Sequence, residues 1–98
     1  MALTLSYFGL HGRAEASRMI LSYGKVDFTD NRVTKEQFGE MKEAGKCQQL
    51  PILECDGKVM NQSEAIARYC AVKAGMYNSS NPEACWRDDS IINTLSDF

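Results

Sequence analysis

Hydrophobic and polar residues alternate at the start of the chain, and the pattern then changes to a helical period. Leu3, Leu5 and Tyr7 alternate with polar residues, which predicts a half-buried strand that ends near Tyr7. After a turn at residues 9–12, apolar residues recur three and four positions apart until Gly24, at Ala16, Met19, Ile20 and Tyr23. This spacing predicts a helix that begins near residue 13 and buries those side chains.

A second alternating run follows that helix. Val26, Phe28 and Asp30 have the period of a strand, and a crossover of this length makes it a parallel neighbour of the first strand. Thr34 and Gln37 then have the spacing of a capping box, which predicts the start of a short helix. The chain therefore opens with a βαβ unit and a further helix.

The segment that begins at Pro51 carries the strongest local signals. Pro51 opens a short apolar run, and the dipeptide Asp56-Gly57 is typical of a tight hairpin turn between two strands. Polar side chains that can cap a helix follow, and apolar residues then recur at helical spacing over about residues 62–74. The pattern predicts a β-hairpin followed by a helix.

The last segment predicts a linker and one more helix. Residues 76–81 are mostly polar, Asn81 is a typical N-cap, and Pro82 suits the first helical position. Within this helix the apolar stripe has no evident partner and consists of Ile91, Leu95 and Phe98. A stripe without a partner favours a fragment over a short natural form.

The order of elements defines the fold class. A βαβ unit, a helix, a β-hairpin and a helix form a thioredoxin-like α/β domain, which we place at residues 1–75. Residues 76–81 are the expected linker to the all-α segment at residues 82–98.

Composition excludes several classes of partner. A formal net charge of −2 without a basic run argues against nucleic acid and against an anionic membrane surface. The N-terminus lacks the pattern of a signal peptide, and no apolar run approaches the roughly 20 residues that span a bilayer. We therefore expect a cytoplasmic protein without a membrane partner.

The four cysteines have the spacing of neither a zinc site nor a redox motif, because the chain contains no Cys-x-x-Cys and no histidine at ligand spacing. An even number of cysteines is compatible with disulfides in a secreted domain, but reduced thiols are favoured here. Their positions are Cys47, Cys55, Cys70 and Cys85.

Three motifs resemble a known family. The chain reads Tyr-Phe-Gly-Leu-His-Gly-Arg-Ala-Glu from Tyr7, Pro-Ile-Leu-Glu-Cys-Asp-Gly from Pro51 and Gln-Ser-Glu-Ala-Ile-Ala-Arg-Tyr from Gln62. Together they resemble glutathione transferases of the tyrosine type, and most closely the sigma class, which includes prostaglandin D synthases. The resemblance extends into the start of the fourth helix, and it implies that residues 82–98 are the first helix of an otherwise absent all-α domain, in a fragment or a short natural form. It also implies a cis peptide bond between Leu50 and Pro51.

The resemblance gives Tyr7 the catalytic role. The thiolate is the nucleophile, and a thiol with a pKa of about 8.5 is only a few per cent ionised at pH 7. Lowering that pKa by two units takes about 2.7 kcal/mol, which a hydrogen bond from one hydroxyl can largely supply. Arg13 is expected beside the phenol. The alternatives are a core tyrosine that closes a strand and an arginine with a structural role at a helix start.

The resemblance also assigns contacts with the glutathione tripeptide. The γ-glutamyl carboxylate goes to Gln62 and Ser63, because free N–H groups at a helix N-terminus favour an anion. Ser63 as an ordinary cap is the alternative. The cysteinyl backbone goes to Leu50, which precedes Pro51.

Four further positions complete the expected site. The glycyl carboxylate goes to Lys42, whose alternative role is a solvated surface charge, and Gln49 is expected near the ligand. Phe38 stands where sigma-class members usually carry tryptophan, and a phenyl ring cannot donate a hydrogen bond. Asp97 is a candidate for the γ-glutamyl ammonium of a ligand held by a partner subunit, which presupposes a homodimer.

Two departures from the family pattern bear on metal binding and assembly. Asn93 and Ser96 replace the acidic pair that is associated with metal activation in the prostaglandin branch, so no metal is predicted. Residues 47–49 contain no large aromatic side chain that could protrude into a partner, so a flatter and more polar dimer interface is expected.

The leading hypothesis is an enzyme that conjugates its substrate glutathione to a hydrophobic electrophile through a Tyr7-stabilised thiolate, as in detoxification. This chain would hold the glutathione-binding half, with weak or no activity alone. Alternatives are a glutathione-dependent prostaglandin D isomerase and a non-catalytic structural protein similar to the lens S-crystallins. The absence of a cysteine from residues 7–13 argues against a thiol-disulfide oxidoreductase.

Overall fold

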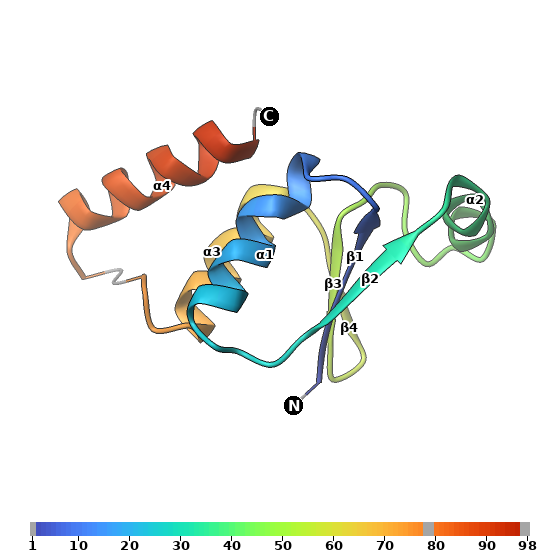
Figure 1. Cartoon of the computed structure of the whole chain (residues 1–98), viewed down its shortest axis with the longest axis horizontal. Coiled ribbons are helices and arrows are strands. Elements are labelled where there is room, and N and C mark those ends of the chain that lie inside the picture. Colours follow the sequence, from blue (N-terminus) through green and yellow to red (C-terminus); the bar gives the residue numbers. More distant parts are fainter. Residues whose placement is uncertain (1, 78–79, 97–98) are drawn as a thin grey trace.

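The structure is a computed structural model that describes residues 2–77 and 80–96, with side chains up to Thr94 in the last helix. Its elements follow the predicted order βαβ-α-ββα with one further helix, so the thioredoxin-like α/β fold is confirmed (Figure 1). In chain order they are β1 (Leu3–Phe8), the 3₁₀-helix η1 (Gly12–Ala14), α1 (Glu15–Tyr23), β2 (Thr29–Val33), α2 (Lys35–Glu43), β3 (Ile52–Cys55), β4 (Lys58–Met60), α3 (Ser63–Lys73) and α4 (Pro82–Ser96).

The described strands form a four-stranded sheet in the order β2-β1-β3-β4. β1 and β2 are parallel, with Phe8 opposite Val33, which confirms the predicted βαβ unit. β2 begins at Thr29, later than the predicted start at Val26. β1 pairs antiparallel with β3, and β3 pairs antiparallel with β4. The central position of β1 fixes Tyr7 near its carboxyl end.

Two local motifs form as their sequences predict. The Thr34 hydroxyl accepts from the Gln37 N–H at 3.1 Å, and the Gln37 side chain accepts from the Thr34 N–H at 2.8 Å, which completes the capping box of α2. Asp56 and Gly57 have φ angles of 51° and 80°. Two consecutive left-handed residues are the requirement of a type I′ hairpin turn, so β3 returns directly as β4.

Helices α1 and α3 lie side by side on one face of the sheet, and α4 lies on their outer side (Figure 1). α2 lies apart from them, beyond the ends of β1 and β2, and contains no buried residue. The core between sheet and helices includes the fully buried Leu5, Leu21, Leu53 and Ile66. Each such side chain stabilises the fold by about 1.5–3 kcal/mol relative to an exposed position.

The buried face of α1 differs from the predicted one. Met19 is 50% exposed and Tyr23 is 82% exposed, whereas α1 buries Ala16, Ser17, Arg18 and Leu21. The prediction followed the largest apolar side chains. Ala16 is the predicted residue that is buried, and the inward face also carries Ser17, Leu21 and Arg18. The small side chains of Ala16 and Ser17 allow α1 to approach the sheet and two other helices closely.

α4 contacts the domain through Ile92, which lies next to the predicted stripe. Ile92 is buried against Ala16 and Ala67, whereas Ile91 is 53% exposed. The exposure of Ile91 agrees with the prediction of a stripe without a partner, and the side chains of Leu95 and Phe98 lie outside the described residues.

Polar contacts fix both ends of the link from α3 to α4. The Asn81 side chain accepts from the Ala84 N–H at 3.2 Å, as a predicted N-cap should. The Arg68 Nε donates to Asp89 at 2.6 Å, and the Tyr77 hydroxyl donates to the same carboxylate at 3.3 Å. The hydrogen bond that Arg68 donates to Asp89 raises the pKa of the Arg68 guanidinium above its ordinary value.

The crossing of α1 and α3 depends on a small residue at Gly24. A Cβ atom at this position would lie 2.4 Å from the Ala74 Cβ atom. We expect Gly24→Ala to lower the free energy of unfolding by about 1–3 kcal/mol through overpacking. Gly39→Ala is the matched control, because a Cβ at this α2 position meets no heavy atom within 4 Å. It should raise stability by roughly 0.5–1 kcal/mol.

Urea denaturation of the two variants measures both effects on the same scale. Equal midpoints for Gly24→Ala and the unsubstituted chain would contradict this account of the helix crossing.

Candidate functional site

Tyr7 lies near the carboxyl end of the central strand β1, and its hydroxyl meets the turn that follows. The side chain belongs to the core and is 9% exposed. Its hydroxyl oxygen accepts a hydrogen bond from the Arg13 backbone N–H at 3.3 Å. Because the phenol oxygen is the acceptor in this bond, its own O–H hydrogen is available to another group.

The turn approaches the phenol so closely that it requires glycine at position 12. Gly12 has a φ angle of 44°, and a Cβ atom there would lie 2.5 Å from the Tyr7 hydroxyl oxygen. Any other L-amino acid would be strained at this φ and would displace the hydroxyl. Gly12 of the Tyr7 motif therefore allows the phenol to occupy its position.

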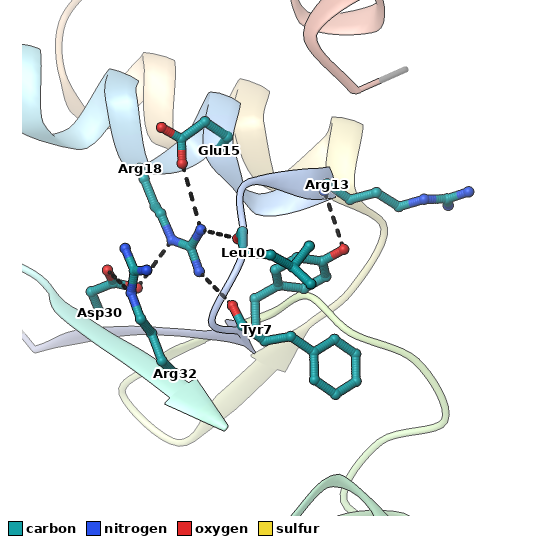
Figure 2. A network of polar contacts seen from close by, with 8 residues as sticks. Tyr7, Leu10, Arg13, Glu15, Arg18, Asp30 and Arg32 are labelled. Atoms are coloured by element: carbon teal, nitrogen blue, oxygen red, sulfur yellow. Dashed lines mark hydrogen bonds and ion pairs between the residues drawn. The ribbon is translucent and has the colours of Figure 1, made fainter. Parts of the chain in front are cut away.

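Arg18 holds the same turn from the other side (Figure 2). Its guanidinium donates to the carbonyls of Leu10 at 2.6 Å and Phe8 at 3.0 Å, and to the Asp30 carboxylate at 3.1 Å. Its Cζ atom lies 5.7 Å from the centroid of the Tyr7 ring, within the range of a cation–π contact. Sequence reasoning missed Arg18.

A signal for Arg18 exists in the sequence. Ala14, Ser17 and Leu21 are spaced three and four apart around it, so Arg18 falls on a stripe of small and apolar residues. An arginine inside a buried stripe needs acceptors from neighbouring elements and is therefore a structural or functional candidate.

Arg13 is placed differently from the expectation. Its backbone N–H reaches the phenol, but Figure 2 shows its side chain pointing away from Tyr7, and the residue is exposed. The cation beside the phenol ring is Arg18.

The peptide bond between Leu50 and Pro51 is cis, as expected. Pro51 is buried and Leu50 is half-buried, next to the start of β3. The ladder between β1 and β3 begins at the pair Ser6 and Ile52, so Leu50 precedes it. Its backbone N–H and C=O are therefore outside the sheet and can pair with an extended peptide.

The N-terminus of α3 lacks the side-chain cap that begins α2 and α4. Its N-cap residue is Gln62, with φ 73° and ψ 106°, and the Gln62 side chain makes no capping hydrogen bond. Ser63 occupies the first helical position and is half-buried. The first-turn N–H groups and the Ser63 hydroxyl form a donor set that suits a carboxylate.

Lys42 and Phe38 lie together on α2. The Lys42 ammonium is 5.1 Å from the centroid of the Phe38 ring, and the Phe38 ring meets Phe8 edge to face at 5.6 Å. Phe8 in turn contacts the Tyr7 ring at 5.5 Å. A row of aromatic rings thus connects the exposed cation on α2 with the phenol on β1. Phe38 provides a platform for the ammonium and donates no hydrogen bond.

A cleft of about 390 Å³ lies between the loop after α2 and the start of α3. Gln49 and Gln62 line it, so the structure brings these two predicted residues together. Tyr7, Lys42 and Ser63 are not among its lining residues in the described part of the chain. Asp97 lies outside the described residues.

Within the described ranges we find no group of three or more His, Cys, Asp or Glu side chains that could hold a metal ion. No helix in those ranges combines the length and apolarity needed to cross a bilayer.

Residues 3–72 match the family model for the glutathione S-transferase N-terminal domain. The chain belongs to the glutathione S-transferase family. It is 42% identical over 93 residues to the probable glutathione S-transferase 7 of Caenorhabditis elegans. The matched region covers 95% of this chain and 43% of that protein. It is 37% identical over 94 residues to the hematopoietic prostaglandin D synthase of Homo sapiens, and the matched region covers 96% of this chain and 47% of that protein.

A solved structure gives the same result. The prostaglandin synthase D of Nilaparvata lugens is similar with a TM-score of 0.78 at 41% identity, over 99% of this chain and 48% of that protein. The resemblance stated from the motifs is therefore confirmed at the level of the family. The chain spans about half the length of these relatives.

The four cysteines of this glutathione S-transferase chain all lie in the described residues and form no disulfide, and three of them are buried, Cys47, Cys55 and Cys70. Burial raises the pKa of the Cys70 thiol to about 11, although the Ser17 hydroxyl acts in the opposite direction. Cys85 is half-buried. A buried thiol with a raised pKa is a poor nucleophile at neutral pH.

We expect iodoacetamide at pH 8 to alkylate Cys85 first and Cys70 last. At a pKa of about 11, roughly one Cys70 thiol in a thousand is ionised at this pH. Peptide mass spectrometry over time gives the order, and Cys85→Ser should remove the fast phase. Alkylation of Cys70 as fast as Cys85 in the folded chain would contradict the assigned burial.

Proposed function

We propose that this chain is the glutathione-binding part of a glutathione transferase in which the Tyr7 hydroxyl stabilises the thiolate of bound glutathione. The observation that carries the proposal is the hydrogen bond at Tyr7. Its oxygen accepts from the Arg13 N–H, so the O–H remains free to donate toward a ligand. An accepted bond also polarises the O–H and strengthens it as a donor.

The reaction follows from this donor. The thiol of glutathione loses its proton to solvent, and the Tyr7 O–H donates to the resulting sulfur anion. The sulfur then forms a bond to an electrophilic carbon, and a leaving group such as chloride departs with the electron pair. Tyr7 keeps its proton throughout, because it acts as a hydrogen-bond donor and not as a base.

Three other regions support binding of the tripeptide. The open N-terminus of α3, with Gln62 and Ser63, suits the γ-glutamyl carboxylate. The backbone of Leu50, before the cis proline and outside the ladder, suits the cysteinyl main chain. The Lys42 ammonium suits the glycyl carboxylate, with Phe38 as its platform.

The remaining assignments rest on the resemblance. We propose a cytoplasmic homodimer that acts in detoxification, with Asp97 reaching the ammonium of a ligand bound by the partner, and a hydrophobic electrophile bound mainly by the rest of the protein. We also retain the division into residues 1–75, 76–81 and 82–98. The coverage supports this, because relatives have about as much sequence again.

A narrower candidate is a glutathione-dependent prostaglandin D isomerase. The similarity to two prostaglandin D synthases favours it. Turnover of a generic aryl halide against turnover of a prostaglandin endoperoxide by the full-length protein separates the two activities. A protein that turns over neither, although it folds, would favour the structural role of an S-crystallin.

Tyr7→Phe tests the donor. The ring packing stays, but the thiolate loses its hydrogen bond, so the pKa of the bound thiol should return toward 8.5. Turnover of the full-length protein at pH 7 should fall about 10- to 30-fold, because the thiolate fraction falls by that factor for a two-unit shift. Glutathione affinity at pH 7 should fall only about fourfold, which is the part that linkage to a two-unit pKa shift requires, since the tripeptide contacts remain. Equal losses in turnover and affinity would refute the role.

Ser63→Ala tests the carboxylate site. Loss of a hydroxyl donor to a charged group should weaken glutathione binding by roughly 1–3 kcal/mol. Calorimetric titration of the chain measures the effect, and Ser22→Ala on the exposed side of α1 is the matched control. If the affinity stays the same in Ser63→Ala, this serine caps the helix and does not bind the ligand.

A further inference from the structure

We propose that Arg18 is the positioning residue for the Tyr7 hydroxyl, and that it acts by holding the turn between β1 and α1. The inference rests on the proposed function only for its catalytic consequence. The position of the Tyr7 hydroxyl depends on a hydrogen bond within this chain, which the Arg13 N–H donates to the Tyr7 oxygen, and it can be tested without a ligand.

The guanidinium is built into the domain and is not a surface charge. The Arg18 side chain is 7% exposed, and its nitrogens reach two backbone carbonyls and two carboxylates. The carbonyls, of Phe8 and Leu10, flank Gly9 at the start of the turn. The carboxylates, of Asp30 and Glu15, lie at 3.1 Å and 3.5 Å. Buried charge of this kind persists only with such partners.

The turn depends on these bonds. Gly9 and Leu10 belong to no helix or strand, and in the described part of the chain no backbone–backbone hydrogen bond holds them. Their neighbours Gly12 and Arg13 set the place of the Tyr7 hydroxyl, one by close approach and the other by its N–H. The bond from Arg13 is long, at 3.3 Å, so small movements of the turn will break it.

The geometry requires the fork of an arginine. Nη1, Nη2 and Nε donate in three directions, to Leu10, Phe8 and Asp30. A lysine ammonium is a single point on a flexible stem and cannot reach all three acceptors at once. Asp30 accepts from Arg18 through Oδ1 and from the exposed Arg32 through Oδ2, at 3.0 Å, so the two arginines do not share an acceptor atom.

Arg18→Lys, which keeps the charge, tests the inference. Amide hydrogen exchange of the free chain, followed by NMR, reports the Arg13 N–H directly. We expect this amide to exchange about tenfold faster than in the unsubstituted chain, the effect of losing one charge-assisted hydrogen bond. Core amides such as those of Leu5 and Ile66 report global opening, and the change at Arg13 should exceed theirs.

Two further variants accompany it. Asp30→Asn keeps the shape and an acceptor but weakens the anchor of the Arg18 Nε, so a smaller increase of about threefold is expected. If Arg18→Lys does not fold, the exchange rate of the Arg13 amide in Asp30→Asn tests the role of Arg18 instead. Arg32→Lys is the matched control, because this arginine is half exposed and contacts Asp30 without touching the turn; no change at Arg13 is expected.

The second measurement is the ultraviolet titration of the thiolate of bound glutathione. In Arg18→Lys the pKa of the bound thiol should rise by about one unit. The glutathione affinity measured at pH 6, where the thiol is mostly protonated in both proteins, should change by less than about twofold. The inference would be overturned if, in both Arg18→Lys and Asp30→Asn, the exchange rate of the Arg13 amide increased no more than the exchange rates of the core amides. Failure of the unsubstituted chain to bind glutathione would instead overturn the proposed function, and the exchange result would still decide the role of Arg18.

Discussion

A buried guanidinium with fixed acceptors is the interaction on which the arrangement around Tyr7 depends. Arg18 joins β1, the turn after it, α1 and β2, because its donors reach Phe8, Leu10, Glu15 and Asp30. A cation at this depth is stable only while every acceptor stays in place. The turn therefore has one low-energy position relative to the strand that carries the phenol, although Gly9 and Leu10 lack regular secondary structure.

The rest of the site consists of backbone groups that the fold leaves available. α2 and α4 close their N-termini with Thr34 and Asn81, whereas α3 begins without a side-chain cap. The antiparallel ladder begins after Leu50. Open donors and acceptors cost free energy in a protein that lacks a ligand. Under the proposed function, these are the groups that bind a tripeptide with a carboxylate at each end and an extended middle.

Local chemistry explains which features the sequence could predict. The capping box at Thr34, the Asp56-Gly57 turn and the Asn81 cap each depend on a few adjacent residues, and each forms as expected. The cis bond before Pro51 followed from the family resemblance and not from the residues alone. These features need no knowledge of what packs against them.

The errors arise where a third element decides between two helical stripes. In α1 the stripe through Met19 and Tyr23 is larger and more apolar, but the one with Ser17 and Arg18 is buried. In α4 the sequence pattern marked the exposed stripe at Ile91 but did not reveal the contact that Ile92 makes with the small residues of α1 and α3. Hydrophobic periodicity fixes the helix but not its rotation when polar and apolar positions are interleaved. Arg18 was missed for this reason.

Apolar packing and the directional bonds of Arg18 act on the same turn in different ways. α4 contacts η1, α1 and α3, and its buried Ile92 packs on Ala16 and Ala67. Such contacts are non-directional, so they set how closely the helices and η1 approach but not the orientation of a carbonyl. The hydrogen bonds from Arg18 have preferred angles and fix that orientation. The Tyr7 hydroxyl therefore needs both, because Gly12 must be close enough to touch it and the Arg13 N–H must point at it.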